Sequence, residues 1–171
     1  MLENKIDGTD LIIRNARPSD AAKIIQLVKQ VMNESPFFPK TPDEFNISVE
    51  QEESYINELA LFLVAEIKGK IIGSATIDRS SLKKLNHSIS LGITILKEYS
   101  GIGIGSLMMK RIIDWANLNK VEKLELEVFS DNLPAIALYK KFGFFEEGRK
   151  RKAIKIDGEH KDLILGRFSG E

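Results

Sequence analysis

The 171-residue chain has no cysteine, and this absence excludes several kinds of chemistry at once. Disulfides, thiol nucleophiles and cysteine-ligated metals are ruled out, and a chain without cysteine fits a reducing cytoplasm. No apolar run approaches the roughly 18 residues that a membrane span needs. The first ten residues, MLENKIDGTD, lack the apolar stretch of a secretory signal. We therefore expect a cytoplasmic protein that is not inserted in a membrane.

The sequence also lacks an excess of charge of either sign. Lysine and arginine together number 25, as do aspartate and glutamate, so no overall field favours nucleic acid or a membrane surface as a partner. Hydrophobic residues make up 43% of the chain and charged residues 29%, which is the balance of a soluble globular protein. Without linkers, repeats or low-complexity tracts, this length predicts a single domain over residues 1–171. The sequence leaves a homodimer open.

The most informative stretch is Tyr99–Trp115, where three glycines at alternate positions lead into an amphipathic helix. Glycine lets a backbone approach a ligand closely, and the start of a helix presents unpaired N–H groups. Together they predict an anion site suited to a phosphate. A dinucleotide fingerprint counted from Gly101 would need a glycine where Ser106 stands. A Walker A loop would need glycine and then lysine where Ser106 and Leu107 stand, so both motifs are excluded.

Hydrophobic patterns around this loop predict a mixed α/β sheet. Apolar residues alternate in His87–Leu96 and in Lys123–Phe129, which is typical of strands with one buried face. Gly92 indicates a bulge or a close approach of two backbones. Asp131–Pro134 carries the start signals of a helix that Gly143 ends. Two further elements are expected near the N-terminus, a strand at Leu11–Ile13 and a helix from Pro18. A second helix runs from Ser48 to about Leu59, because Ser48 and Gln51 have the spacing of a capping box. Strands are expected at Leu61–Ile67 and Lys70–Ile77, joined by a tight hairpin at Lys68-Gly69, and at Phe144–Ile156 and His160–Phe168.

The segment Asn33–Phe45 holds three of the five prolines, so we expect neither a regular helix nor a strand there. Two compatible interpretations stay open. The segment is a loop pinned to the core by Phe37 and Phe38, or it is a lid that faces the substrate.

The strand, the glycine loop with its helix, the next strand and the pattern N-x-x-A-x-x-x-Y-x-x-x-G-F from Asn132 to Phe144 resemble the GNAT family of acyl-CoA N-acyltransferases. The resemblance covers most of the chain in element order. It implies the GNAT fold, a central and mostly antiparallel twisted sheet that is splayed at the cofactor site, with helices packed on it. It also implies transfer of an acetyl group from acetyl-CoA to a primary amine, by direct attack in a ternary complex and without a metal.

The resemblance assigns residues to the cofactor. The pyrophosphate of acetyl-CoA would lie on the amides of the glycine loop, and the pantetheine arm would pair with the backbone of the preceding strand. Asn132 matches a residue that binds the pantetheine or orders a water. Ser100 stands where the family prefers Arg or Gln, so we expect somewhat weaker cofactor binding. The residues assigned are Ile93, Thr94, Ile95, Gly101, Ile102, Gly103, Ile104, Gly105, Ser106 and Asn132.

Two residues are assigned to the chemistry, each with an alternative. Tyr139 matches the family tyrosine that donates to the sulfur of CoA, and otherwise it is a core tyrosine on an apolar helix face. Glu127 lies five residues before Asn132, as does the base proposed for the bacterial ribosomal-protein alanine N-acetyltransferases that this region resembles. It also alternates with Glu125 and could lie on a solvated face. His87, at a strand end, is a rival base or a structural residue.

The acceptor stays open among a small amine or polyamine, an amino-acid-like compound and a protein N-terminus. A non-catalytic acyl-CoA sensor or subunit is the alternative from another class, because it would keep the loop without needing Tyr139. A phosphate-binding nucleotide domain is a third alternative, which does not require the pattern from Asn132 to Phe144. The basic run Arg149–Lys152 is expected to be a solvated edge of the sheet, with a role toward an acidic substrate as its alternative.

Overall fold

The structure, a computed structural model, describes residues 10–168. Within them the chain forms a mixed α/β sheet of seven strands with four helices, in the order that the sequence predicts. The strand order is β1-β2-β3-β4-β5-β7-β6. The elements are β1 (Leu11–Asn15), α1 (Ala21–Glu34), α2 (Val49–Glu58), β2 (Leu61–Ile67), β3 (Lys70–Arg79), β4 (Ser88–Ile95), α3 (Ile104–Leu118), β5 (Lys123–Phe129), α4 (Leu133–Lys141), β6 (Phe145–Ile156) and β7 (Glu159–Phe168).

The described chain divides into two compact units that interleave in sequence. The first comprises residues 10–78 and 92–112, and the second comprises residues 79–91 and 113–168. The prediction of a single domain over residues 1–171 stays a prediction. No helix between residues 10 and 168 combines the length and the apolar character needed to cross a membrane.

In the first unit, β1, β2 and β3 form an antiparallel meander. Ile13 lies opposite Ala65, and Phe62 lies opposite Thr76. The hairpin between β2 and β3 turns at Lys68-Gly69, whose φ angles are 48° and 80°. Two successive positive φ angles suit the tight hairpin that this dipeptide predicts.

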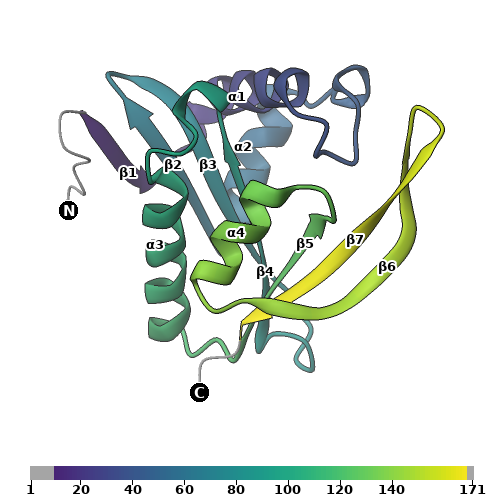
Figure 1. Cartoon of the computed structure of the whole chain (residues 1–171). Helices are drawn as coiled ribbons and strands as arrows, with labels where there is room; N and C mark the ends of the chain where they lie inside the picture. The colour runs from purple at the N-terminus through teal and green to yellow at the C-terminus, as the bar shows by residue number, and fades with distance from the viewer. Residues whose placement is uncertain (1–9, 169–171) are drawn as a thin grey trace. The chain divides into compact units, whose positions relative to one another are not determined.

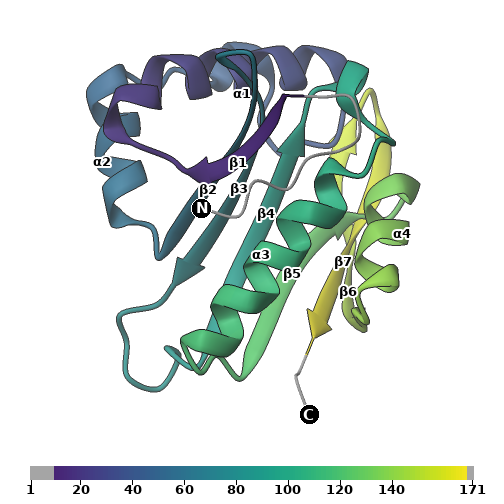
Figure 2. The same ribbon diagram turned by 90° about the vertical axis from the view of Figure 1, so that its left-hand side faces the viewer.

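Helices cover both faces of this meander. The first two helices, α1 and α2, lie over one face (Figure 1), where the Tyr55 ring meets the Phe62 ring edge-on with centroids 6.0 Å apart. The N-terminal half of α3 covers the other face (Figure 2). An added Cβ at Gly73 would lie 3.5 Å from Met108 Cε and 3.1 Å from the Thr94 carbonyl oxygen. Glycine at this position therefore lets β4 and α3 approach β3 closely.

Local signals set the ends of the first two helices. Pro18 begins a short 3-10 helix, Pro18–Asp20, and α1 follows it directly. The capping box predicted for α2 is confirmed, because Gln51 N donates to Ser48 Oγ and Ser48 N donates to Gln51 Oε1. The proline-rich segment between α1 and α2 is mostly irregular and contains a 3-10 helix, Pro42–Glu44.

In the second unit, β5 pairs in parallel with the start of β4 over Ser88–Ser90 and antiparallel with β7. The strands β6 and β7 form a long ribbon (Figure 1) that turns at Asp157-Gly158 with φ angles of 49° and 82°. Helix α4 lies beside this ribbon (Figure 2), where the Phe144 ring lies 5.6 Å from the Phe168 ring.

The basic run Arg149–Lys152 lies on β6, where the strand is irregular. The register with β7 shifts between Lys150 and Ile154, and Lys152 adopts a φ of 51°. This irregularity lets Lys152 N and the Arg149 side chain both reach the Asp162 carboxylate. The expected solvated edge is confirmed, because β6 ends the strand order and residues 149–152 are exposed.

Candidate functional site

The glycine loop in the first unit joins β4 to α3 through a chain of tight turns. Leu96 N donates to the Ile72 carbonyl, and Tyr99 N donates to the Leu96 carbonyl. Gly101 and Gly103 then adopt φ angles of 77° and 97°, which side chains disfavour. An added Cβ on either glycine would meet no atom within 4 Å. The glycines are therefore required by backbone conformation, and their Cα atoms border open space.

The start of α3 places backbone amides behind this loop. The first helical hydrogen bond runs from Leu107 N to the Gly103 carbonyl at 3.1 Å. The Ile104 side chain is 1% exposed and so fixes the start of the helix in the core. The backbone amides before Leu107 have no carbonyl of the helix as a partner. The amides of Ile104 and Gly105 can thus serve an anion, which is the geometry that the sequence predicts for a phosphate.

Three side chains that sequence patterns did not single out as loop contacts hydrogen-bond to the residues just before the glycines or to their neighbours. The Glu34 carboxylate, at the end of α1, accepts from Lys97 N at 3.0 Å, and this hydrogen bond lowers the pKa of Glu34. Lys70 Nζ donates to Glu98 Oε1 at 3.2 Å and lies 5.8 Å from the Tyr99 ring centroid. Ser100 Oγ donates to the Leu96 carbonyl at 3.4 Å. Ser100 therefore makes a short-range contact within the loop.

The cofactor residues predicted on β4 adjoin the loop. Ile93, Thr94 and Ile95 are the last three residues of the strand, and each is half-buried. Gly92, one residue earlier, is exposed, and an added Cβ there would lie 3.4 Å from Thr76 Oγ1 on β3. The predicted bulge at Gly92 and the splay beside it stay predictions.

Asn132 and Tyr139 belong to the second unit, where Asn132 precedes α4 and Tyr139 lies on it. Asn132 is the N-cap, and its Oδ1 accepts from Ala135 N at 3.4 Å. Tyr139 is 9% exposed, and its ring packs 5.8 Å from the Phe144 ring. Burial raises the pKa of Tyr139 to about 12. The hydroxyl therefore keeps its proton throughout the physiological range and can act only as a neutral donor or acceptor.

Glu127 lies on β5 in the second unit with a half-exposed side chain. Lys150 Nζ on β6 pairs with its carboxylate at 2.5 Å. The neighbour two residues earlier, Glu125, pairs with Lys123 at 2.6 Å. Both glutamates lie on β5, two residues apart, and each carboxylate pairs with one lysine, although Lys123 also pairs with Glu147.

The rival base, His87, has a backbone role at the strand end. Its carbonyl oxygen accepts from Glu122 N at 2.9 Å and from Lys123 N at 3.3 Å. These bonds fix the start of β5 beside β4. Among residues 10–168 no group of three or more His, Asp or Glu side chains is arranged to hold a metal ion.

A buried carboxyl on α2 is a further feature that sequence patterns did not single out. Glu52 is 5% exposed, and burial raises its pKa. Tyr55, three residues later, lies near Glu52 and Asp78, and its hydroxyl hydrogen-bonds to Thr76. The i, i+3 spacing of Glu52 and Tyr55 on α2 could have indicated a shared face. The burial of Glu52 depends on how α2 packs against the sheet, which could not be predicted from the sequence.

Comparison with known proteins agrees with this geometry. The sequence model of the acetyltransferase (GNAT) family matches residues 25–144. The L-amino acid N-acetyltransferase AaaT of Escherichia coli K12 is 38% identical over 101 residues, which is 58% of this chain and 62% of that protein. An N-alpha-acetyltransferase of Sulfurisphaera tokodaii is 31% identical over 168 residues, 92% of this chain and 93% of that protein.

A solved structure shows the same fold. The acetyltransferase of the GNAT family from Streptococcus pneumoniae matches with a TM-score of 0.90 and 32% identity, covering 94% of this chain and 100% of that one. The family match extends over more than half of the chain, and the full-length relatives are acetyltransferases. The chain therefore belongs to the GNAT family of acetyltransferases.

Proposed function

We propose that this protein transfers the acetyl group of acetyl-CoA to a primary amine by direct attack in a ternary complex. The observation that supports the proposal most is the loop at the start of α3, where Gly101 and Gly103 have positive φ angles and the first helix amides suit an anion, in a chain of the GNAT family. In this proposal Gly101, Ile102, Gly103, Ile104, Gly105 and Ser106 hold the pyrophosphate, and Ile93, Thr94, Ile95 and Asn132 hold the pantetheine arm.

Tyr139 supplies the proton for the leaving group in this proposal. When the amine attacks, a C–N bond forms, the C–S bond of the thioester breaks, and the sulfur departs as a thiolate. A CoA thiolate needs a proton at neutral pH, and a tyrosine whose pKa is about 12 is fully protonated there. Burial of the ring positions the hydroxyl by packing, which favours a fixed donor.

Glu127 is our proposal for the group that takes the proton of the attacking amine, through a water. Its carboxylate is half-exposed and paired with Lys150, so solvent can reach it. Glu125, two residues earlier on the same strand and paired with Lys123, offers a control in which the same charge is removed from another lysine-paired carboxylate.

We propose an α-amino group as the acceptor. AaaT is named for L-amino acids, and the S. tokodaii relative is named for N-alpha acetylation. An α-amino group with a pKa near 8 is neutral in about one molecule in ten at pH 7, whereas a lysine side chain near 10.4 is neutral in about one in 2,500. A half-exposed base therefore has less deprotonation to perform on an α-amino acceptor than on a lysine side chain.

A panel assay tests this proposal. CoA release from acetyl-CoA is measured with L-amino acids, short peptides with free N-termini and polyamines, using the wild type, Glu127→Gln and Glu125→Gln. We expect acetylation of amino acids or peptides, a fall in kcat/KM of at least tenfold for Glu127→Gln, and little change for Glu125→Gln. Activity confined to polyamines would contradict the acceptor. Equal activity of the two variants would contradict the role of Glu127. Binding of acetyl-CoA without turnover of any amine would favour a sensor.

A further inference from the structure

The last turn of α1, in the first unit, carries a carboxylate where the electrostatics of a helix disfavour one. Glu34 ends the helix, and this turn, VMNE, contains no basic residue. The carbonyls at a helix C-terminus bear a partial negative charge, so an acidic side chain there lowers the stability of the helix. Gln30, one turn earlier, donates to Glu34 Oε1 at 3.0 Å, which orients the carboxylate without removing this repulsion. The position of Glu34 therefore points to a contact outside the helix.

That contact is with the entry to the glycine loop. Glu34 Oε2 accepts from Lys97 N at 3.0 Å, between positions 63 apart in the chain. Lys97 begins a 3-10 turn, Lys97–Tyr99, and the residue before the turn is Leu96. A leucine side chain has no oxygen that could accept from the first amides of a helical turn. The carboxylate of α1 supplies that acceptor from another element of the fold.

The turn that begins at Lys97 leads directly into the glycines. Before it, Leu96 is 1% exposed and its N–H donates to the Ile72 carbonyl at 2.9 Å. Within it, Ser100 N donates to the Lys97 carbonyl at 3.1 Å. Gly101 follows at once with a φ of 77°. The direction in which the chain enters the anion site is therefore set at Lys97.

A second contact on the same turn is weaker. Lys70 Nζ lies 3.2 Å from Glu98 Oε1, and the two side chains are 54% and 56% exposed. Ion pairs at such exposure contribute little, because water and salt screen the charges and two long side chains must be ordered. The bond to Glu34 starts from a backbone amide that is already part of the turn, and a charged acceptor makes it about twice as strong as a neutral bond. Of the two contacts, the one from Glu34 therefore does more to hold the turn.

We propose that Glu34 is a positioning residue for the CoA loop. By holding the Lys97 amide, it keeps the loop in the conformation that binds the pyrophosphate before the cofactor arrives. The inference rests on the proposed use of Gly101–Ser106 for CoA. A loop that occupies its binding conformation only part of the time lowers the apparent affinity by that fraction. A variant that frees the turn should therefore bind CoA more weakly while it stays folded.

This effect is opposite in sign to the effect of the charge on Glu34. A carboxylate near an anion site repels the ligand, so removal of the charge alone would tighten the binding of CoA. Loss of the hydrogen bond would weaken it. Glu34→Ala and Glu34→Gln separate the two effects, because both remove the charge and only the glutamine amide keeps an oxygen acceptor.

Titration calorimetry with CoA tests the inference without an acetyl acceptor. The proteins are the wild type, Glu34→Ala, Glu34→Gln and Glu58→Ala, which removes an exposed carboxylate from the last residue of α2 in the same unit. We expect the Kd for CoA to rise about five- to tenfold in Glu34→Ala. It should rise by no more than about threefold in Glu34→Gln, because a neutral acceptor makes a weaker bond, and it should not change in Glu58→Ala.

Hydrogen exchange of the Lys97 amide, followed by nuclear magnetic resonance, reports on the hydrogen bond itself. Exchange should be faster in Glu34→Ala than in the wild type, at a melting temperature close to that of the wild type. A wild type that does not bind CoA would overturn the proposed function as well. With CoA bound by the wild type, three results would overturn the role of Glu34 alone: an unchanged or lower Kd in Glu34→Ala, a glutamine variant as weak as the alanine variant, or an equal rise in Glu58→Ala.

Discussion

Tyr139 illustrates how one residue can serve both packing and chemistry. Its ring is buried against Phe144, and the same burial raises the pKa of its hydroxyl to about 12. Tyr139→Phe keeps the ring and removes only the donor. We predict a fall in kcat of about 100-fold, the lower end of general acid catalysis, with KM for acetyl-CoA nearly unchanged. Initial rates of CoA release measure both constants.

The stability of the same variant provides the control, since a phenylalanine should keep the melting temperature close to that of the wild type. A rise in KM for acetyl-CoA with kcat unchanged would contradict the donor role and indicate a binding residue. Because Tyr139 titrates only near pH 12, no loss of wild-type activity between pH 7 and pH 10 should be traceable to this residue.

Glu52 gives a prediction about stability and pH. Burial raises its pKa, so the folded protein holds this proton more tightly than the unfolded chain does. The contribution to stability is fully present below the unfolded pKa of about 4.3, and it is lost as the pH rises through the raised folded value. Glu52→Gln should therefore increase the free energy of unfolding at pH 7.5, by up to about 1 kcal/mol, with the gain vanishing near pH 4.

Urea unfolding at the two pH values measures this difference. Glu58→Gln, an exposed position on the same helix, removes the same charge and should change stability little at either pH. A Glu52→Gln variant that is less stable than the wild type at pH 7.5 would show that the carboxylate is favourably bound in the folded state.

At the scale of one element, we predict that the glycine loop is sensitive to substitution of Gly103. Gly103 has a φ of 97° and Gly69, at the tip of the β2–β3 hairpin, has a φ of 80°, and neither has an atom within 4 Å of an added Cβ. Alanine should strain each position by about 1–2 kcal/mol. Only Gly103→Ala should raise KM for acetyl-CoA, by roughly tenfold, because its backbone must bend toward the pyrophosphate. Steady-state kinetics and melting temperatures of both variants test this, and an equal change in KM for Gly69→Ala would contradict it.

Elements governed by local signals could be predicted from the sequence. The capping box of Ser48 and Gln51, the hairpin at Lys68-Gly69 and the N-cap at Asn132 each depend on residues within a few positions. The bounds of β2 follow from a run of β-forming residues before the turn, those of β5 follow from alternation, and both are confirmed residue for residue. The start of α1 differs because Pro18 opens a 3-10 turn before the helix.

What could not be predicted depends on residues far apart in the chain. The partner of Arg14, Glu66, lies 52 residues away, and the brace from Glu34 to Lys97 joins positions 63 apart. The alternation of Glu125 and Glu127 indicates a shared face, but it does not name Lys150 as a partner. In the candidate site, the glycine loop and the N-cap at Asn132 could be predicted from the sequence, whereas the contacts that hold the loop from Glu34 and Lys70 required the fold.

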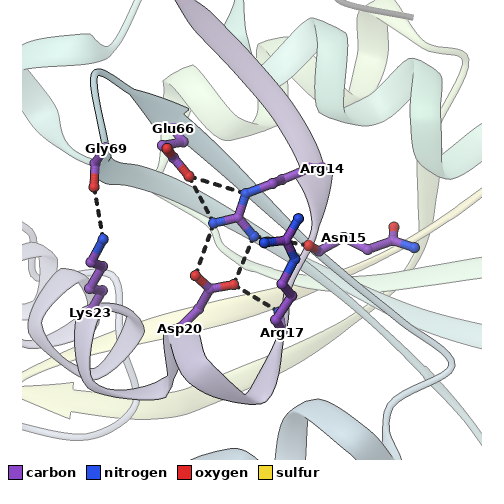
Figure 3. Close-up of polar contacts among 7 residues, drawn as sticks. All are labelled: Arg14, Asn15, Arg17, Asp20, Lys23, Glu66 and Gly69. Carbon is purple, nitrogen blue, oxygen red and sulfur yellow. Dashed lines mark hydrogen bonds and ion pairs between the residues drawn. The ribbon is translucent and has the colours of Figure 1, made fainter. Parts of the chain in front are cut away.

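The ion pairs of Arg14 with Asp20 at 2.8 Å and with Glu66 at 2.7 Å (Figure 3) give a prediction for the whole first unit, since they tie β1, β2 and the start of α1 together. The side chains of Arg14, Asp20 and Glu66 are 14%, 8% and 20% exposed. Arg14→Ala would leave two carboxylates without their cation, and we predict a loss of about 2–4 kcal/mol in the free energy of unfolding at pH 7, near the range for a broken buried pair. Arg79→Ala, which removes an exposed hydrogen bond to the Asn86 carbonyl, should cost less than about 1 kcal/mol.

The pH dependence gives this prediction a second readout. The hydrogen bond from Arg14 lowers the pKa of Asp20, so the stability that the pair contributes is present above the unfolded pKa of about 3.9. It is lost as the pH falls through the lowered folded value. The difference in the free energy of unfolding between the wild type and Arg14→Ala should therefore become smaller below pH 4. A difference that stays constant down to pH 2.5 would contradict the ion-pair explanation.

Mass spectrometry of the reaction product is the most direct test of the acetyl-transfer activity. The wild type is incubated with acetyl-CoA and a short peptide that has both a free N-terminus and a lysine side chain, and the product is fragmented to locate the modification. We predict one added acetyl group on the α-amino nitrogen, with one CoA released for each product formed and a much slower reaction for Tyr139→Phe. Acetyl-CoA binding with no acetylated product from this peptide, from free amino acids or from polyamines would contradict the proposed enzyme.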